Sequence, residues 1–224
     1  CSLVGSEMCI RDRVDSMKKY HCYSASFDDK TEELFREAIF LGQGNNGVVY
    51  KLPENKVIKI FVEEKVCSDE SYTLSRTNGS KYFPRIYKIG KLYIVREMVE
   101  GIQLDKYIKK NGLNLELTRN IYKLIKEFKR LDFSKIDTRC KDVYVKDDCT
   151  IMLIDPKKCY KRKVNFPRHL MKGFLKLEVL DDFIKYMEKI DKKKAKEWKN
   201  KFDKYWQKES QKEKYQRDDE DLYL

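Results

Sequence analysis

The pattern of hydrophobic and polar positions changes at Gly101. Upstream of it, β-branched and aromatic residues gather in short stretches at residues 40–52, which glycines interrupt, and at 56–62, 85–89 and 92–97. These stretches predict five strands, with a short charged helix at 27–38 before them and a helical or loop segment at 66–77 between the third and the fourth. Five strands and one inserted helix are typical of a small antiparallel α+β unit.

Downstream of Gly101 the period becomes helical. Apolar residues recur at the i, i+3, i+4 and i+7 positions of an amphipathic helix, namely Ile121, Leu124, Ile125, Phe128 and Leu131. Residues 143–145 and 151–154 flank a polar turn and predict a hairpin. Helical spacing returns between residues 174 and 206, with Phe183, Met187, Ile190, Ala195, Trp198 and Phe202 on one side. The second half is therefore predicted to be mainly helical, ending in a frayed acidic tail at 218–221.

Composition supports a folded chain but selects no partner. The 224 residues are 41% hydrophobic, so a core can form, and 38% charged with a net charge of +12. Most of the positive surplus lies in residues 156–217, where lysines alternate with glutamates. This favours a solvated helical face, and nucleic acid binding stays open as the less favoured interpretation. No apolar run reaches the ~18 residues that a membrane span needs, so no membrane partner is expected.

The first residues and the cysteines bear on processing and compartment. Residues 1–13 resemble the translation of a sequencing-library adapter, so we expect residues 1–16 to be a non-native leader and Met17 to be the first natural residue. The remaining cysteines, Cys22, Cys67, Cys140, Cys149 and Cys159, include no CxxC pair. This argues against a zinc site or a disulfide framework. With no signal peptide after Met17, we expect a cytoplasmic protein with reduced thiols.

A glycine motif, Gly42-x-Gly44-x-x-Gly47, lies between the first two predicted strands. A dinucleotide-binding fingerprint requires a helix directly after the glycines, whereas residues 48–51 are strand-like. A glycine hairpin followed by a strand that carries a lysine, here Lys59, resembles the protein kinase superfamily, particularly its compact bacterial members. The resemblance implies a two-lobed α+β fold. Its N-lobe would be a small antiparallel sheet (17–100), followed by a reduced, mainly helical C-lobe (101–190) and a basic helix with an acidic tail (191–224).

The resemblance also implies an ATP site in the first half. Backbone N–H groups at the three glycines would approach the phosphates, Val49 would contact the nucleotide, and Lys59 would add a fixed cation. In the family a helix glutamate holds this lysine, and Glu70 is the best match.

Three further acidic residues compete with Glu70 for this role: Glu63, Glu64 and Asp69.

The resemblance also implies a hinge that binds adenine, and this hinge would use backbone groups of Glu97 and Val99. Arg96 would then lie where the family limits the pocket behind adenine, and a charge there is unusual.

Three aspartates in the second half match the family's catalytic spacing. Asp142 lies five positions after Asp137, and Asp155 lies thirteen positions further on, at the end of the second hairpin strand. By resemblance, Asp137 would orient or deprotonate the acceptor hydroxyl, and Asp142 and Asp155 would hold Mg²⁺. Arg139 would steady the transferring phosphoryl group, or would only balance the charge of Asp137.

Several positions depart from the family pattern. Lys135 stands where the family has a histidine that braces the catalytic loop, and Pro156 and Lys157 follow Asp155 in place of Phe and Gly. Fewer than about twenty residues separate Asp155 from the next helical pattern, too few for a full activation segment. His169 has no partner motif, so we interpret it as a packed or surface histidine.

These observations predict an ATP- and Mg²⁺-dependent phosphotransferase that resembles an atypical Ser/Thr kinase. It would move the γ-phosphate of ATP to a hydroxyl of a protein or a small molecule. A nucleotide-binding pseudokinase that acts as a regulatory scaffold is the first alternative. A basic nucleic-acid-binding protein on the same fold is the second.

Overall fold

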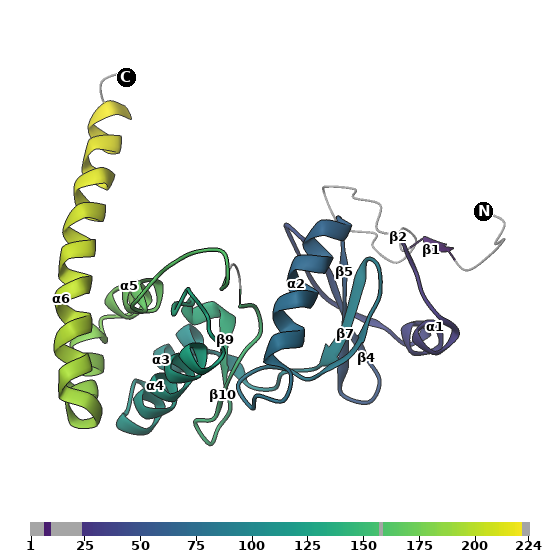
Figure 1. Ribbon diagram of the computed structural model, residues 1–224, viewed down its shortest axis with the longest axis horizontal. Coiled ribbons are helices and arrows are strands. Elements are labelled where there is room, and N and C mark those ends of the chain that lie inside the picture. Colours follow the sequence, from purple (N-terminus) through teal and green to yellow (C-terminus); the bar gives the residue numbers. More distant parts are fainter. Residues whose placement is uncertain (1–6, 10–23, 157–158, 221–224) are drawn as a thin grey trace. The chain divides into compact units, whose positions relative to one another are not determined.

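The computed structural model describes residues 7–9, 24–156 and 159–220 (Figure 1). The chain divides into two compact units, Cys1–Val99 and Glu100–Leu224. Most of the expected leader lies outside the described residues. Its short described stretch, β1 (Glu7–Cys9), pairs antiparallel with β2 (Ser24–Ser26).

The first unit contains the predicted sheet of five antiparallel strands, in the order β3-β4-β5-β7-β6. The strands are β3 (Ile39–Gly44), β4 (Gly47–Leu52), β5 (Lys56–Phe61), β6 (Ile86–Ile89) and β7 (Tyr93–Glu97). One helix, α2 (Glu64–Thr77), connects β5 to β6. The expected strand number, antiparallel pairing and inserted helix are thus confirmed, and the fold is α+β.

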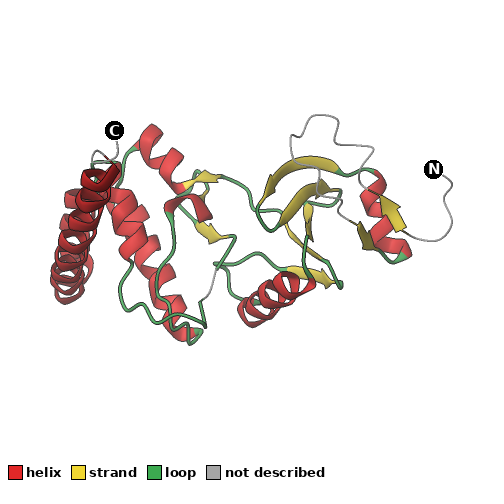
Figure 2. Cartoon of the chain, turned by 90° about the horizontal axis from the view of Figure 1, so that it is seen from above, coloured by secondary structure: helices red, strands yellow, loops and turns green. Residues whose placement is uncertain are grey.

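Helices α1 and α2 pack against opposite faces of this sheet (Figure 2). Helix α1 (Asp29–Arg36) begins after Asp28, whose carboxylate accepts from the Thr31 amide at 2.8 Å. Side chains alternate across a strand, so Ile58 of β5 packs with Phe35 of α1 while Phe61 packs with α2. This alternation places Lys59 on the α2 face.

The second unit is mainly helical. It contains β8 (Ile102–Gln103), α3 (Leu104–Asn111), α4 (Leu115–Arg130), the 3₁₀ turn η2 (Cys140–Asp142), β9 (Val143–Val145), β10 (Ile151–Leu153), α5 (Arg168–Lys176) and α6 (Leu180–Glu220). The predicted hairpin is β9–β10, and β8 adds a third antiparallel strand to it. The sequence pattern missed β8 and α3. Strand β8 has two residues and helix α3 has about two turns, and both are too short to show a hydrophobic period.

The long helix α6 lies alongside α4 and α5 (Figure 1). Its backbone leaves helical geometry at Asp191, whose carboxylate accepts a 2.5 Å hydrogen bond from the Tyr122 hydroxyl of α4. The predicted apolar side is buried, with Trp198 1% exposed. The prediction of a frayed tail was wrong for residues 218–220, which continue α6. Residue 221 lies outside the described part. No helix in the described ranges has an apolar stretch long enough to cross a membrane.

Candidate active site

The glycine motif forms the turn between β3 and β4. An added Cβ at Gly42 or Gly44 would meet no atom of the described residues within 4 Å, whereas one at Gly47 would lie 2.1 Å from the Ile60 carbonyl oxygen of β5. Only Gly47 is therefore required by packing. The backbone at Gly42 and Gly44 is open on the side where a Cβ would be, which leaves room for another molecule to approach.

Lys59 and Val49 are directly paired across β5 and β4, so their side chains share one face of the sheet. On that face the Lys59 Nζ lies 2.5 Å from Glu70 Oε2, and the two side chains are 14% and 12% exposed. The ammonium also lies 4.6 Å from the centre of the Phe61 ring. Lys59 is thus held from two directions in a largely buried position.

The helical period of α2 explains why Glu70 is the partner. Cys67 and Leu74 are buried against the sheet, and Glu70 lies between them on the same side of the helix. The rival Glu64 pairs instead with Lys91 at 2.8 Å, and Glu63 precedes the first residue of α2. The structure therefore brings together the two residues that the sequence pattern favoured.

The predicted hinge residues lie at the end of β7. Glu97 donates its amide to the Arg85 carbonyl at 2.8 Å, and its carbonyl accepts from Arg96 Nη1 at 3.3 Å. Arg96 is buried, with 8% exposure. The Arg96 side chain thus occupies the Glu97 carbonyl, one of the backbone groups that the resemblance assigned to adenine binding. Val99 is the last residue of the first unit.

In the second unit the β9–β10 hairpin brings Asp142 and Asp155 together. Asp142 precedes β9 and Asp155 follows β10, and the strands are antiparallel with Leu153 opposite Val143. The Ile154 amide also donates to the Asp142 carbonyl at 3.0 Å. Both carboxylates therefore lie at one end of the hairpin.

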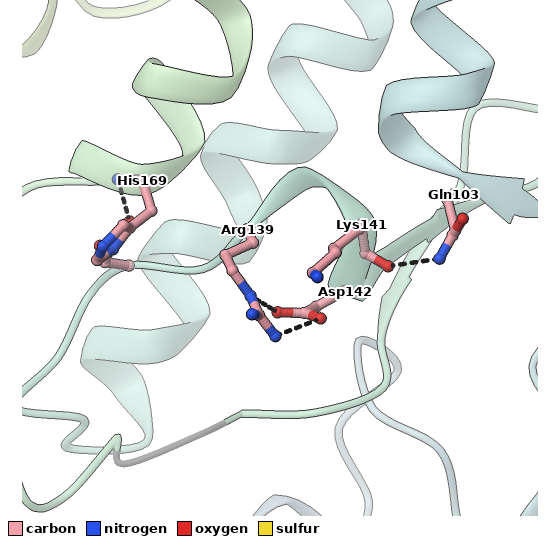
Figure 3. Close-up of polar contacts among 6 residues, drawn as sticks. Gln103, Arg139, Lys141, Asp142 and His169 are labelled. Atoms are coloured by element: carbon pink, nitrogen blue, oxygen red, sulfur yellow. Dashed lines mark hydrogen bonds and ion pairs between the residues drawn. The ribbon is translucent and has the colours of Figure 1, made fainter. Parts of the chain in front are cut away.

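Arg139 points at Asp142 (Figure 3). Its Nε and Nη2 donate to the two carboxylate oxygens at 2.7 and 3.0 Å. The hydrogen bond to Asp142 raises the pKa of Arg139, and the charges of Asp142 and Asp155 act in the same direction. Arg139 thus pairs with Asp142 and feels the charge of Asp155, and among the described contacts it has no ion pair with Asp137.

Two carboxylates at one end of a hairpin suit Mg²⁺, which takes one or two carboxylates and completes its shell with water and phosphate oxygens. No group of three or more His, Cys, Asp or Glu side chains in the described ranges is arranged to hold a metal alone. Asp142 and Asp155 could therefore supply at most part of the coordination shell of such an ion.

Asp137 is buried and is held by α5. Its side chain is 0% exposed. Oδ1 accepts from the His169 amide at 3.0 Å, Oδ2 lies 2.5 Å from His169 Nδ1, and Arg168 Nε is 3.8 Å away. Lys135, where the resemblance implied a bracing histidine, is half-buried, and this burial lowers its pKa.

The contact between His169 and Asp137 was missed from the sequence, which indicated only a packed or surface histidine. The two residues are 32 positions apart, and no motif joins them. The available signal was the lysine at position 135, where the family has a histidine. Without that histidine, another residue must hold Asp137 in place, and His169 is a candidate.

Comparison with known proteins gives a distant similarity. No protein-family model matches the chain. Over 133 residues it is 20% identical to a protein of Bacillus subtilis (strain 168) named "Putative serine/threonine-protein kinase YrzF". The match covers 57% of this chain and spans 62% of the length of that relative.

Proposed function

We propose that the chain is an ATP- and Mg²⁺-dependent phosphotransferase of the protein-kinase type, with a hydroxyl group as acceptor. The observation that carries the proposal is the Lys59–Glu70 ion pair, next to a glycine turn whose Gly42 and Gly44 are open. The similarity to a protein named as a Ser/Thr kinase supports it.

The position of Lys59 is better explained by ligand binding than by stability. A buried ion pair contributes little net stability, because desolvation of both charges offsets their attraction. A lysine held by a glutamate is, however, a cation of fixed direction. Near a glycine turn with space at Gly42 and Gly44, it is suited to phosphate oxygens.

Residues of the second unit supply the other requirements of phosphoryl transfer. Asp142 and Asp155 would hold the magnesium ion, which when bound neutralises charge on the phosphates. Arg139, which pairs with Asp142, would turn toward the transferring phosphoryl group once the ion takes its place.

A nucleotide-binding protein without turnover is the second candidate. The bidentate Arg139–Asp142 pair favours it, since it occupies both oxygens of one magnesium ligand. Pro156 directly after Asp155 also restricts the backbone there.

The deciding experiment compares Lys59→Met with Lys91→Met. Both lysines pair with a glutamate of α2, but the Lys91 side chain is 78% exposed and that of Lys59 is 14% exposed. Binding of Mg²⁺·ATP is measured by calorimetry, and turnover by ADP release and by phosphate incorporation from γ-labelled ATP. We expect Lys59→Met to lose both, and Lys91→Met to match the unchanged chain.

Each other outcome points elsewhere. Mg²⁺·ATP binding without turnover in the unchanged chain would select the nucleotide-binding alternative. Neither binding nor turnover, together with salt-sensitive binding of a polynucleotide, would favour the nucleic-acid-binding protein.

A further inference from the structure

The His169 imidazole lies against a carboxylate that solvent does not reach. The Asp137 side chain is 0% exposed, whereas that of His169 is 39% exposed. A general base must come within hydrogen-bond distance of the proton that it removes. Of these two groups, the histidine ring is the one that an acceptor can contact.

We propose that His169 is the general base of this protein and that Asp137 acts through it as a positioning residue. The inference rests on the proposed phosphotransferase function. It assigns proton removal to a residue thirteen positions beyond Pro156, outside the three aspartates that the spacing identified.

The hydrogen bonds determine the tautomer. An ionised carboxylate only accepts hydrogen bonds, so the nitrogen 2.5 Å from Asp137 Oδ2, His169 Nδ1, carries the proton. The neutral ring then has its lone pair on Nε2. In the part of the chain that the structure describes, Nε2 has no recorded hydrogen-bond partner.

Backbone contacts fix the ring in place. The His169 amide donates to Asp137 Oδ1 at 3.0 Å, so Asp137 holds both the backbone and the ring at the start of α5. One helical turn later, a Cβ at Gly173 would lie 2.5 Å from Cys140 Sγ. The Cys140 thiol donates to the Leu170 carbonyl at 3.7 Å. These contacts hold α5 against the segment that carries Asp137.

The positive charges around Asp137 come from two parts of the chain, α5 and the segment that carries Asp137 itself. Arg168 of α5 lies 3.8 Å from Oδ2 and stacks on Tyr205 of α6. Lys135 and Arg139 lie on the same segment as Asp137, and the Asp137 charge acts on Lys135. Asp137 thus stabilises an imidazolium among neighbouring cations, and Asp142, whose charge also acts on Lys135, adds a second negative charge nearby.

The step balances as follows. The acceptor oxygen forms a bond to the γ-phosphorus while the bond from that phosphorus to the β,γ-bridging oxygen breaks, and ADP leaves with the electron pair. The hydroxyl proton passes to His169 Nε2 and then to solvent. Asp137 stabilises the imidazolium and keeps its own charge throughout, as in other carboxylate–histidine pairs.

Three variants test the proposal on the full chain. In His169→Asn the side-chain amide can still donate to Asp137, but no base remains. His169→Ala removes both functions, and Asp137→Asn removes the carboxylate charge. We expect His169→Asn to bind Mg²⁺·ATP within about twofold of the unchanged chain, because the ring does not contact the nucleotide in this proposal.

The same variant should lose kcat by about 10²–10⁴-fold, together with the acidic limb of the pH–kcat profile. Added imidazole should restore part of the kcat of His169→Ala. Full activity of His169→Asn would overturn the proposal and leave a positioning role only. Thermal unfolding of each variant checks that the fold is retained.

A second measurement does not depend on turnover. The chain has two histidines, His21 and His169, so ¹⁵N NMR of their rings can be assigned with His169→Asn. We expect protonated Nδ1 and unprotonated Nε2 in His169, and a change in Asp137→Asn. The opposite tautomer would overturn the dyad in a chain that still transfers phosphate. Absence of Mg²⁺·ATP binding and turnover in the unchanged chain would overturn the proposed function and, with it, this inference.

Discussion

Gly47 of β4 lies against Ile60 of β5 so closely that a Cβ at position 47 would be 2.1 Å from the Ile60 carbonyl oxygen. Nothing comparable restricts Gly44 at the other end of the turn. The two glycines of one motif thus serve different purposes, and substitution separates them.

We expect Gly47→Ala to lower the free energy of unfolding by about 1–3 kcal/mol, because the methyl group forces two paired strands apart. Gly44→Ala, whose Cβ would meet no atom within 4 Å in the part of the chain that the structure describes, should stay within about 0.5 kcal/mol of the unchanged chain. It should weaken Mg²⁺·ATP binding at least about tenfold by blocking backbone access to the phosphates. Urea unfolding and calorimetry measure the two effects. A Gly44→Ala variant with unchanged nucleotide affinity would show that no phosphate approaches this turn.

The Lys59–Glu70 pair should show strong coupling in a double-mutant cycle. Lys59→Met or Glu70→Leu alone removes one charge of a largely buried ion pair, at about 2 kcal/mol of unfolding free energy. The double variant should recover most of this loss, with a coupling energy of about 1–2 kcal/mol.

The exposed pair Lys91–Glu64, substituted in the same way, provides the control. Its side chains are 78% and 56% exposed, so its coupling should be much weaker than that of the Lys59–Glu70 pair. Equal coupling in the two pairs would contradict the buried character of the first.

Asp155→Asn should raise the Mg²⁺ concentration for half-maximal ATP binding at least about tenfold, since an amide is a weaker ligand than a carboxylate for a hard cation. Asp147→Asn, at an exposed position in the β9–β10 turn, should leave the Mg²⁺ dependence unchanged. Magnesium titrations at constant ATP measure both. An unaltered midpoint in Asp155→Asn would remove this residue from the ion site.

Glu197 of α6 should make stability depend on pH under acid conditions. Hydrogen bonds from Lys194 and Lys201 lower its pKa from an ordinary value of 4.5 to about 2. A lowered pKa in the folded state stabilises the protein above pH 4.5, and this contribution is lost as the pH falls toward 2. The unfolding free energy of the unchanged chain should therefore fall more steeply across this range than that of Glu197→Gln. Glu188→Gln, an exposed site on the same helix, should follow the unchanged chain.

The local sequence pattern was sufficient to predict the sheet and the contacts between one strand and one neighbouring helix. Strand alternation fixes the face of Lys59, and the helical period of α2 fixes that of Glu70, so their meeting follows from two short stretches. The same holds for Asp142 and Asp155, because an antiparallel hairpin returns to its starting end.

Contacts between residues that a long stretch of chain separates could not be predicted in this way. His169 reaches Asp137 because the start of α5 lies against the segment that carries Asp137, and no periodicity in the sequence predicts this packing. The burial of Asp137 depends on the same packing. Strand β8 and helix α3 were missed for another reason, since short elements take their stability from tertiary packing rather than from intrinsic propensity.

The contact of Gly173 with Cys140 restricts how this protein can change. Any side chain at position 173 must displace the Cys140 sulfur, so a larger residue there requires a smaller one at 140. Gly173→Ala alone should be harmful and Gly173→Ala with Cys140→Gly tolerated. The two positions should therefore vary together among related chains, so that an alignment could reveal their proximity where a single sequence does not.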